Sequence, residues 1–319
     1  MHHSRYHHST DLSFPTQLRD KSATAASLFC YFNTMALLLG LFAALCWSIH
    51  DLAARRLAPG VGAFRLGLLT EGAGFVLMLP LLFGTPSASL QNWLGIVILG
   101  ITYGAAIAGL FKAFAKAPVS VVGPFTAGYP ALIVIWGMIG GLTPTWPQFL
   151  SIAAILAGAV IVGRSGHRDG GMNVVKKGKV PELIFWILLA DVCFAASIIM
   201  GQKLGPVFGD MRTAGLLRIP AALVLVPFAL IDRGSRPKIS PQIWLVLFGM
   251  GALDIAALTG INAMGVLPYK ELGAMGISAY GAIAVPLAMI WLKEKVSRGE
   301  WFGIAMIVAG VAGLGAQVG

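Results

Sequence analysis

The chain has 319 residues, of which 57% are hydrophobic and only 11% are charged. This balance excludes an ordinary soluble globular protein and indicates an integral, multi-pass membrane protein. The net charge of +10 therefore predicts Lys and Arg in loops that face an anionic lipid bilayer, and no binding to nucleic acid.

The first 34 residues are polar and have no helical period. We expect a disordered tail over residues 1–34, or a start placed upstream of the native one, because Met35 opens the first apolar run directly. The tail contains His2, His3, His7 and His8 without a Cys or carboxylate at a suitable spacing. We therefore predict no metal site, and no motif indicates a cofactor.

Ten apolar runs follow, each close to the length that a membrane-spanning helix needs. The predicted fold class is accordingly an all-α membrane protein with ten transmembrane helices. We expect these helices over residues 36–55, 63–83, 93–114, 119–140, 147–164, 182–202, 211–231, 242–264, 271–292 and 299–317.

A basic, Gly-rich linker over residues 165–181 divides the chain into halves over residues 35–164 and 182–319. The halves repeat each other: Trp47 and Phe194, each preceded by Cys, lie 147 positions apart, and Pro118 and Pro268 lie 150 apart. Because each half has an odd number of helices, the second half must enter the membrane from the opposite side. We therefore predict two inverted five-helix repeats.

The closing segment has the most specific pattern in the chain. Pro286 lies in the penultimate helix, Glu294 lies in a charged turn, and small residues recur from Gly303 to Gly310, where they let helix backbones approach closely in lipid. In this order the segment resembles the closing hairpin of EamA-type repeats in the drug/metabolite transporter superfamily. The corresponding turn of the first half, residues 140–144, lacks the acidic residue.

The resemblance covers about residues 36–317 and implies a secondary transporter that moves a small organic metabolite by alternating access. Export of an amino acid or related solute is the expected activity, with protons as a candidate coupling ion. A nucleotide-sugar or sugar-phosphate exchanger and a drug efflux pump stay open as alternatives, as does assembly into a homodimer. The expected location is the plasma membrane, as the inner membrane of a bacterium.

Two other classes of protein fit the sequence poorly. An enzyme is not expected, because the chain has no HExxH, GxSxG or GxxxxGK[ST] motif. A channel would need rings of like charge from identical subunits, whereas the expected spans contain single charges of mixed sign.

Ionisable and aromatic side chains inside the expected spans are the candidate functional residues, because a charge at the centre of a helix in lipid costs about 2.5 to 3.5 kcal/mol. Glu71 and Arg218 occupy equivalent positions, 147 apart, which predicts an ion pair that is either structural or in contact with solute. Asp254 lies near mid-span without an assigned basic partner, so we expect it to carry protons. The remaining cavity candidates are Trp47, His50, Tyr103, Tyr129, Asp191 and Tyr280.

For the Trp and Tyr candidates, a place in the membrane–water interface is the alternative. Asp51 and Lys112 fit equally well as residues near helix ends that extend their charges toward water.

The loops after the odd-numbered spans contain most of the basic residues, including a cluster of five between Arg164 and Lys179. By the positive-inside rule these loops are cytoplasmic, which places both termini outside the cytoplasm. Many members of the superfamily that this chain resembles have both termini in the cytoplasm instead. Our prediction of the orientation rests on the distribution of basic residues. Alkaline phosphatase fused after Gly319 should therefore be active, whereas fluorescence from a reporter that folds only in the cytoplasm would contradict this orientation.

Overall fold

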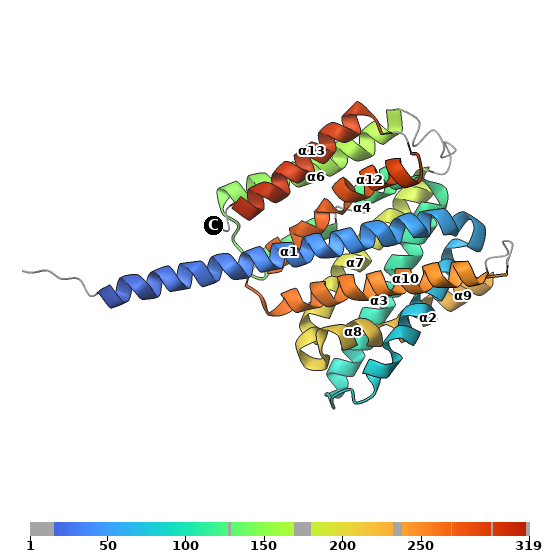
Figure 1. The fold of residues 1–319 in the computed structure, drawn as a ribbon, viewed down its shortest axis with the longest axis horizontal. Helices are drawn as coiled ribbons and strands as arrows, with labels where there is room; N and C mark the ends of the chain where they lie inside the picture. Colours follow the sequence, from blue (N-terminus) through green and yellow to red (C-terminus); the bar gives the residue numbers. More distant parts are fainter. Residues whose placement is uncertain are drawn as a thin grey trace, which may run out of the picture.

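The computed structural model describes residues 16–126, 129–168, 180–231, 238–268, 270–294 and 296–316, and within these ranges the ordered elements are all helices (Figure 1). They are α1 (Thr16–Val61), α2 (Ala63–Leu82), α3 (Leu90–Lys116), α4 (Val119–Thr126), α5 (Tyr129–Ile139), α6 (Trp146–Arg168), α7 (Val180–Phe208), α8 (Asp210–Leu216), α9 (Arg218–Ile231), α10 (Pro241–Ala263), α11 (Lys270–Ala274), α12 (Ala279–Trp291) and α13 (Arg298–Ala316), with 3₁₀ turns η2 (Met264–Val266) and η3 (Met275–Ser278).

The expected all-α membrane fold is confirmed. Six helical segments are long and apolar enough to cross a membrane, namely Thr34–Val61, Ala63–Leu82, Leu90–Lys116, Val180–Phe208, Asp210–Ile231 and Pro241–Val266. Shorter apolar helices cover Tyr129–Ile139, Trp146–Gly158 and Met275–Trp291. The expected linker over residues 165–181 lies mostly outside the described residues.

Two of the expected spans are broken within the described residues. The seventh consists of α8 and α9, and the ninth of α11, η3 and α12. The break in the seventh has a direct cause in proline, whose ring clashes with the carbonyl four residues earlier. Pro220 lies four residues after Leu216, where α8 ends. The expected fourth span contains α4 and α5.

The N-terminal segment differs from the expectation of disorder over residues 1–34. Helix α1 begins at Thr16 and runs without interruption to Val61, and only residues 1–15 of the expected tail lie outside the described residues. The sequence has neither Gly nor Pro between Pro15 and Gly40. A helix nucleated in the apolar span can therefore extend toward the N-terminus, because each added residue adds one hydrogen bond.

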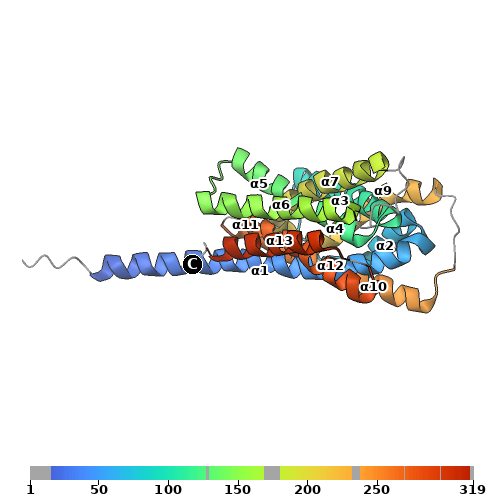
Figure 2. The same ribbon diagram turned by 90° about the horizontal axis from the view of Figure 1, so that it is seen from above.

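Helices α6 and α13 lie side by side (Figures 1 and 2) and run in opposite directions. An added Cβ atom at Gly158 would lie 2.6 Å from the carbonyl oxygen of Gly303, and one at Gly310 would lie 2.6 Å from that of Ser151. Ser151 and Gly303 lie 152 positions apart in the sequence, as do Gly158 and Gly310. Gly158 thus contacts Gly303, and its counterpart Gly310 contacts Ser151, which is the counterpart of Gly303. Two halves related by a twofold axis require this exchange of partners.

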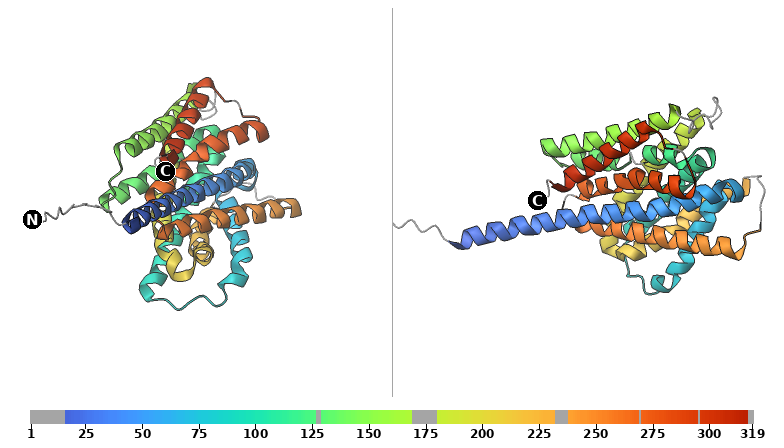
Figure 3. Two further views of the ribbon diagram at one scale, coloured as in Figure 1. Left: turned by 60° about the vertical axis from the view of Figure 1, so that its left-hand side comes forward. Right: turned by 45° about the horizontal axis from the view of Figure 1, so that its top comes forward.

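The centre of the bundle is formed by α1, α3, α7 and α10, with α1 crossing the molecule (Figure 3). Helix α1 packs against α10, and α3 packs against α7. These two pairs correspond to each other if the halves are exchanged. Buried side chains of all four helices form one continuous core, and polar residues gather inside it.

The α6–α13 contact generates a stability prediction. Gly158→Ala and Gly310→Ala each place a methyl group against a backbone carbonyl, so each should lower the stability of the purified protein by about 1 to 3 kcal/mol. Gly249→Ala in α10 is the matched control, because a Cβ atom there meets nothing within 4 Å. Thermal unfolding in detergent measures the difference, and equal melting temperatures for the three variants would contradict this packing.

Candidate solute-binding site

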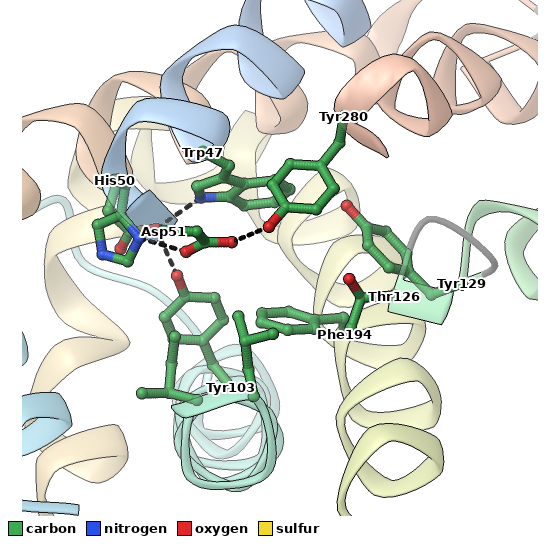
Figure 4. Close-up of a pocket in the computed structure, with 11 residues that line it drawn as sticks. Trp47, His50, Asp51, Tyr103, Thr126, Tyr129, Phe194 and Tyr280 are labelled. Carbon is green, nitrogen blue, oxygen red and sulfur yellow. Dashed lines mark hydrogen bonds and ion pairs between the residues drawn. The ribbon is translucent and has the colours of Figure 1, made fainter. Parts of the chain in front are cut away.

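A cavity lies at the centre of the bundle, halfway along the span Thr34–Val61 of α1 (Figure 4). Its volume is about 20 Å³, which is room for about one water molecule. The structure therefore has the cavity in a closed form, and a metabolite can enter only if the surrounding helices move apart. Its wall consists of Trp47, His50, Asp51, Tyr103, Ile107, Leu110, Thr126, Tyr129, Phe194, Asp254 and Tyr280.

Asp254 of α10 is bound by donors from three other helices. Its Oδ1 atom accepts hydrogen bonds from Trp47 Nε1 at 2.8 Å and from the Tyr103 hydroxyl at 2.5 Å. Its Oδ2 atom lies 2.8 Å from Nη2 of Arg218. The premise that Asp254 has no basic partner is therefore wrong, and the reason for choosing it as the proton carrier no longer holds.

Arg218 is shared between two carboxylates. Besides its contact with Asp254, its Nη1 atom lies 3.1 Å from Oε2 of Glu71, and all three side chains are buried. The guanidinium fits because α2 has a glycine beside it: a Cβ atom at Gly74 would lie 2.5 Å from Arg218 Nη1. A simple exchange of the acid and the base would place a carboxylate beside Asp254 where its cation now lies, so the two charges are not interchangeable.

A second acidic group faces the cavity from α1. The Oδ1 atom of Asp51 lies 2.6 Å from His50 Nδ1, and its Oδ2 atom accepts a hydrogen bond of 2.7 Å from the Tyr280 hydroxyl (Figure 4). Sequence reasoning left Asp51 open between a helix end and the interior, and the structure places it in the interior. The signal was its position next to His50, one turn after Trp47.

Aromatic rings form most of the remaining wall. The Phe194 ring lies between those of Trp47, Tyr103 and Tyr129, with centroid distances of 6.1, 5.9 and 5.6 Å. Tyr129 lies in α5, and Tyr280 lies at the start of α12, next to the 3₁₀ turn η3, so the broken ninth span meets the cavity at its break. Transporters commonly bind solutes at such breaks near the middle of the membrane. Phe194 was not among the candidates, although its equivalence to Trp47 indicated it.

The two remaining charged candidates lie off the cavity wall. Asp191 is buried in α7, three residues before Phe194, and its Oδ1 atom has no hydrogen-bond partner among the described residues. Lys112 of α3 is half-buried and points its ammonium group at the Phe64 ring, 4.9 Å from the centroid.

The cavity is closed at both ends along α1. Toward the N-terminus of α1, the backbones of α1 and of α11 and η3 touch: a Cβ atom at Gly276 would lie 2.7 Å from the Leu37 carbonyl oxygen. Toward the C-terminus of α1, Arg55 Nη1 donates to the Phe114 carbonyl at 2.7 Å, and Arg55 Nε lies 3.7 Å from Oε1 of Glu294. Val119, at the start of α4, also donates to this carboxylate at 3.4 Å.

A helical membrane bundle with a small closed cavity, walled by acidic and aromatic residues beside a broken helix, is an arrangement found in membrane transporters. The chain belongs to the EamA-like transporter family, whose profile matches residues 34–164 and 182–316. This confirms the resemblance to the drug/metabolite transporter superfamily and places the protein among transporters rather than enzymes.

Similar proteins include one named "uncharacterized transporter" from Archaeoglobus fulgidus, which is 23% identical over 87% of this chain and 96% of its own. A second, from Pseudomonas fluorescens, is named probable 4-amino-4-deoxy-L-arabinose-phosphoundecaprenol flippase subunit ArnE and is 34% identical over 26% of this chain and 69% of its own. A solved crystal structure, 22% identical, superposes with a TM-score of 0.64 over 87% of this chain and 95% of its own, and it shows the same fold.

The shared guanidinium generates a second stability prediction. Arg218→Gln leaves Glu71 and Asp254 as buried carboxylates without their cation, so it should cost about 3 to 5 kcal/mol or abolish folding. Glu71→Gln should cost less, because Asp254 still compensates Arg218. The control is Glu182→Gln, which breaks the part-exposed Lys116–Glu182 pair of 2.9 Å and should cost less than about 1 kcal/mol. Folded yield and melting temperature measure the order, and a larger loss for Glu71→Gln than for Arg218→Gln would contradict it.

Proposed function

We propose that this protein moves an amino acid or a related amine-bearing metabolite across the membrane by alternating access. The observation that carries the proposal is the acidic, aromatic-walled cavity at the middle of α1. Two carboxylates, Asp51 and Asp254, line it from different helices. An ammonium group is the natural partner for such a site, because it gains from both the carboxylates and the aromatic faces.

The charge balance favours this solute over the alternatives. Glu71, Asp51 and Asp254 are three carboxylates, whereas Arg218 is already bound to two of them. An entering phosphate would meet excess negative charge, which disfavours nucleotide sugars and sugar phosphates. A cationic drug would fit the charges as well, and its transport is one outcome of the test below.

The opposite wall suits the rest of an amino acid. The Tyr129 hydroxyl is buried at the cavity and has no hydrogen-bond partner among the described residues. A phenol hydroxyl is a hydrogen-bond donor, so it can donate to a carboxylate group of the solute. Phe194, Ile107 and Leu110 offer an apolar surface to a side chain of modest size.

Alternating access requires that the two closures along α1 open in turn. Breaking the contact at Leu37 would admit solute from one side, and breaking the contact of Arg55 with Glu294 would admit it from the other. An inward proton gradient would drive export, which agrees with a place in the inner membrane of a bacterium. The name of the ArnE relative contains both an amino sugar and a phosphate, so this partial match does not choose between the solutes.

Transport of a defined panel by purified protein in proteoliposomes tests the proposal. The panel contains radiolabelled amino acids, their decarboxylated amines, a cationic dye and a nucleotide sugar. We expect amino acids to exchange, and Tyr129→Phe to weaken their apparent affinity by roughly 10- to 100-fold while leaving the matching amines unchanged, because it removes one hydrogen bond to a charged group. Trp136→Phe, at a side chain exposed on the outside of the bundle, is the control. Exchange of the nucleotide sugar alone, or of no panel member, would overturn the proposal.

A further inference from the structure

The cavity contains two acidic groups that differ in how firmly they are bound. Asp254 has both oxygen atoms engaged by Trp47, Tyr103 and Arg218. Among the described residues, the hydrogen-bond partners of Asp51 are His50, its neighbour in the chain, and the Tyr280 hydroxyl. We propose that the His50–Asp51 pair, and not Asp254, is the site where a proton enters and leaves during transport. This inference rests on the proposed function only for the identity of the solute.

Asp254 is poorly placed to exchange a proton. A proton added to Oδ1 would have to displace the Trp47 or Tyr103 donor, and a proton on Oδ2 would neutralise the charge that compensates the Arg218 guanidinium. Arg218 would then depend on its contact with Glu71. Each step would weaken a buried interaction.

His50 and Asp51 offer a proton a place that needs no such loss. His50 Nδ1 carries a hydrogen that it donates to Asp51 Oδ1 across the 2.6 Å contact, and the second ring nitrogen, Nε2, can take up and release a proton while that hydrogen bond is kept. Both side chains line the cavity. Imidazole is the side chain that ordinarily exchanges protons near neutral pH. The His50 ring is held in place against Phe111 at a centroid distance of 5.8 Å, so its nitrogen stays aimed at the carboxylate.

Because of the charges around the pair, a proton on His50 and a cationic solute compete for the same site. The titratable groups that face the pair are Glu71 on α2, Tyr129 on α5, Asp254 on α10 and Tyr280 on α12, and Tyr103 on α3 and Arg218 on α9 contact Asp254. With a proton on His50, the carboxylates of Glu71, Asp51 and Asp254 face two cations. Without it they face one, and the site gains affinity for a further cation.

The exchange then balances as follows. When the cavity opens to one side, the imidazolium of His50 releases its proton to water, and the ammonium group of the solute takes the place of the imidazolium as the cation beside Asp51. On the other side the solute leaves and a proton returns to His50. One proton moves against one ammonium group, and no covalent bond other than the nitrogen–hydrogen bond is made or broken.

The first test needs no solute. Protein with isotope-labelled histidine in lipid bilayers is titrated by NMR between about pH 5 and pH 9, the range in which imidazole exchanges protons. We expect one titrating resonance that is missing from His50→Gln. Tyr280→Phe, which removes a donor to Asp51 with little change of shape, should shift its midpoint, and Glu182→Gln should not. The proposal is overturned if the His50 resonance does not titrate, or if Tyr280→Phe leaves the midpoint of its titration unchanged.

The second test measures the coupling. Release of one proton for each bound solute predicts that the apparent affinity for the transported amino acid rises about tenfold per pH unit below the midpoint. His50→Gln should make the affinity independent of pH while exchange at equal pH on both sides continues. If Asp254→Asn removes the pH dependence and His50→Gln does not, the proton belongs to Asp254.

The two proposals fail separately. Absence of transport for every panel member, with a normal His50 titration, overturns the proposed solute and leaves the proton site. Transport of an amino acid by a protein whose His50 does not titrate overturns the proton site and leaves the proposed solute.

Discussion

The guanidinium of Arg218 is the group on which the centre of this protein depends. It is fully buried in a bundle that lies in lipid, where an uncompensated charge is costly. Its two carboxylate partners come from α2 and α10, so three helices are fixed at one point. The same contact places Asp254, and Asp254 in turn orients the Trp47 and Tyr103 donors. One cation thus determines the shape of the cavity wall.

The opposite side of the cavity is bound more weakly. Tyr280 of α12 reaches α1 through one hydrogen bond to Asp51, and its carbonyl accepts one from the Ser48 hydroxyl at 3.3 Å. Hydrogen bonds from a hydroxyl group, to a carboxylate or to a carbonyl, contribute less than those that join two ions. The cavity therefore has one wall held by buried ion pairs and one held mainly by hydroxyl groups. A transporter needs this combination, because some helices must keep the site intact while others move.

Much of this arrangement could be predicted from the sequence. Hydrophobic runs gave the spans, and the 147-residue spacing related Glu71 to Arg218. Aromatic residues inside spans indicated Trp47, Tyr103, Tyr129 and Tyr280, which all line the cavity. The second partner of Arg218 could not be predicted, because it depends on α10 packing close against α2, where a Cβ atom at Gly251 would lie 2.9 Å from the Cα atom of Gly74.

Other features were within reach of the sequence but were missed. Pro220 predicts the end of α8 through the carbonyl four residues earlier. Asp51 fitted a helix end because Arg55 and Arg56 follow it, yet α1 continues to Val61. With that extra length, Asp51 lies near the middle of the span rather than at its border. An error of two turns in one helix end was enough to leave an acidic residue of the cavity undecided.

The repeat also explains why the centre of the protein cannot be symmetric. Glu71 and Arg218 occupy equivalent positions and meet at 3.1 Å, and the rings of the equivalent Trp47 and Phe194 lie 6.1 Å apart. Two identical halves would bring like charges together at the first of these contacts, and two guanidinium or two carboxylate groups there would repel each other in a medium of low dielectric constant. An ion pair between equivalent positions therefore exists only if the two halves differ in sequence. The divergence of acid from base at this one pair of positions is a condition for the bundle to close.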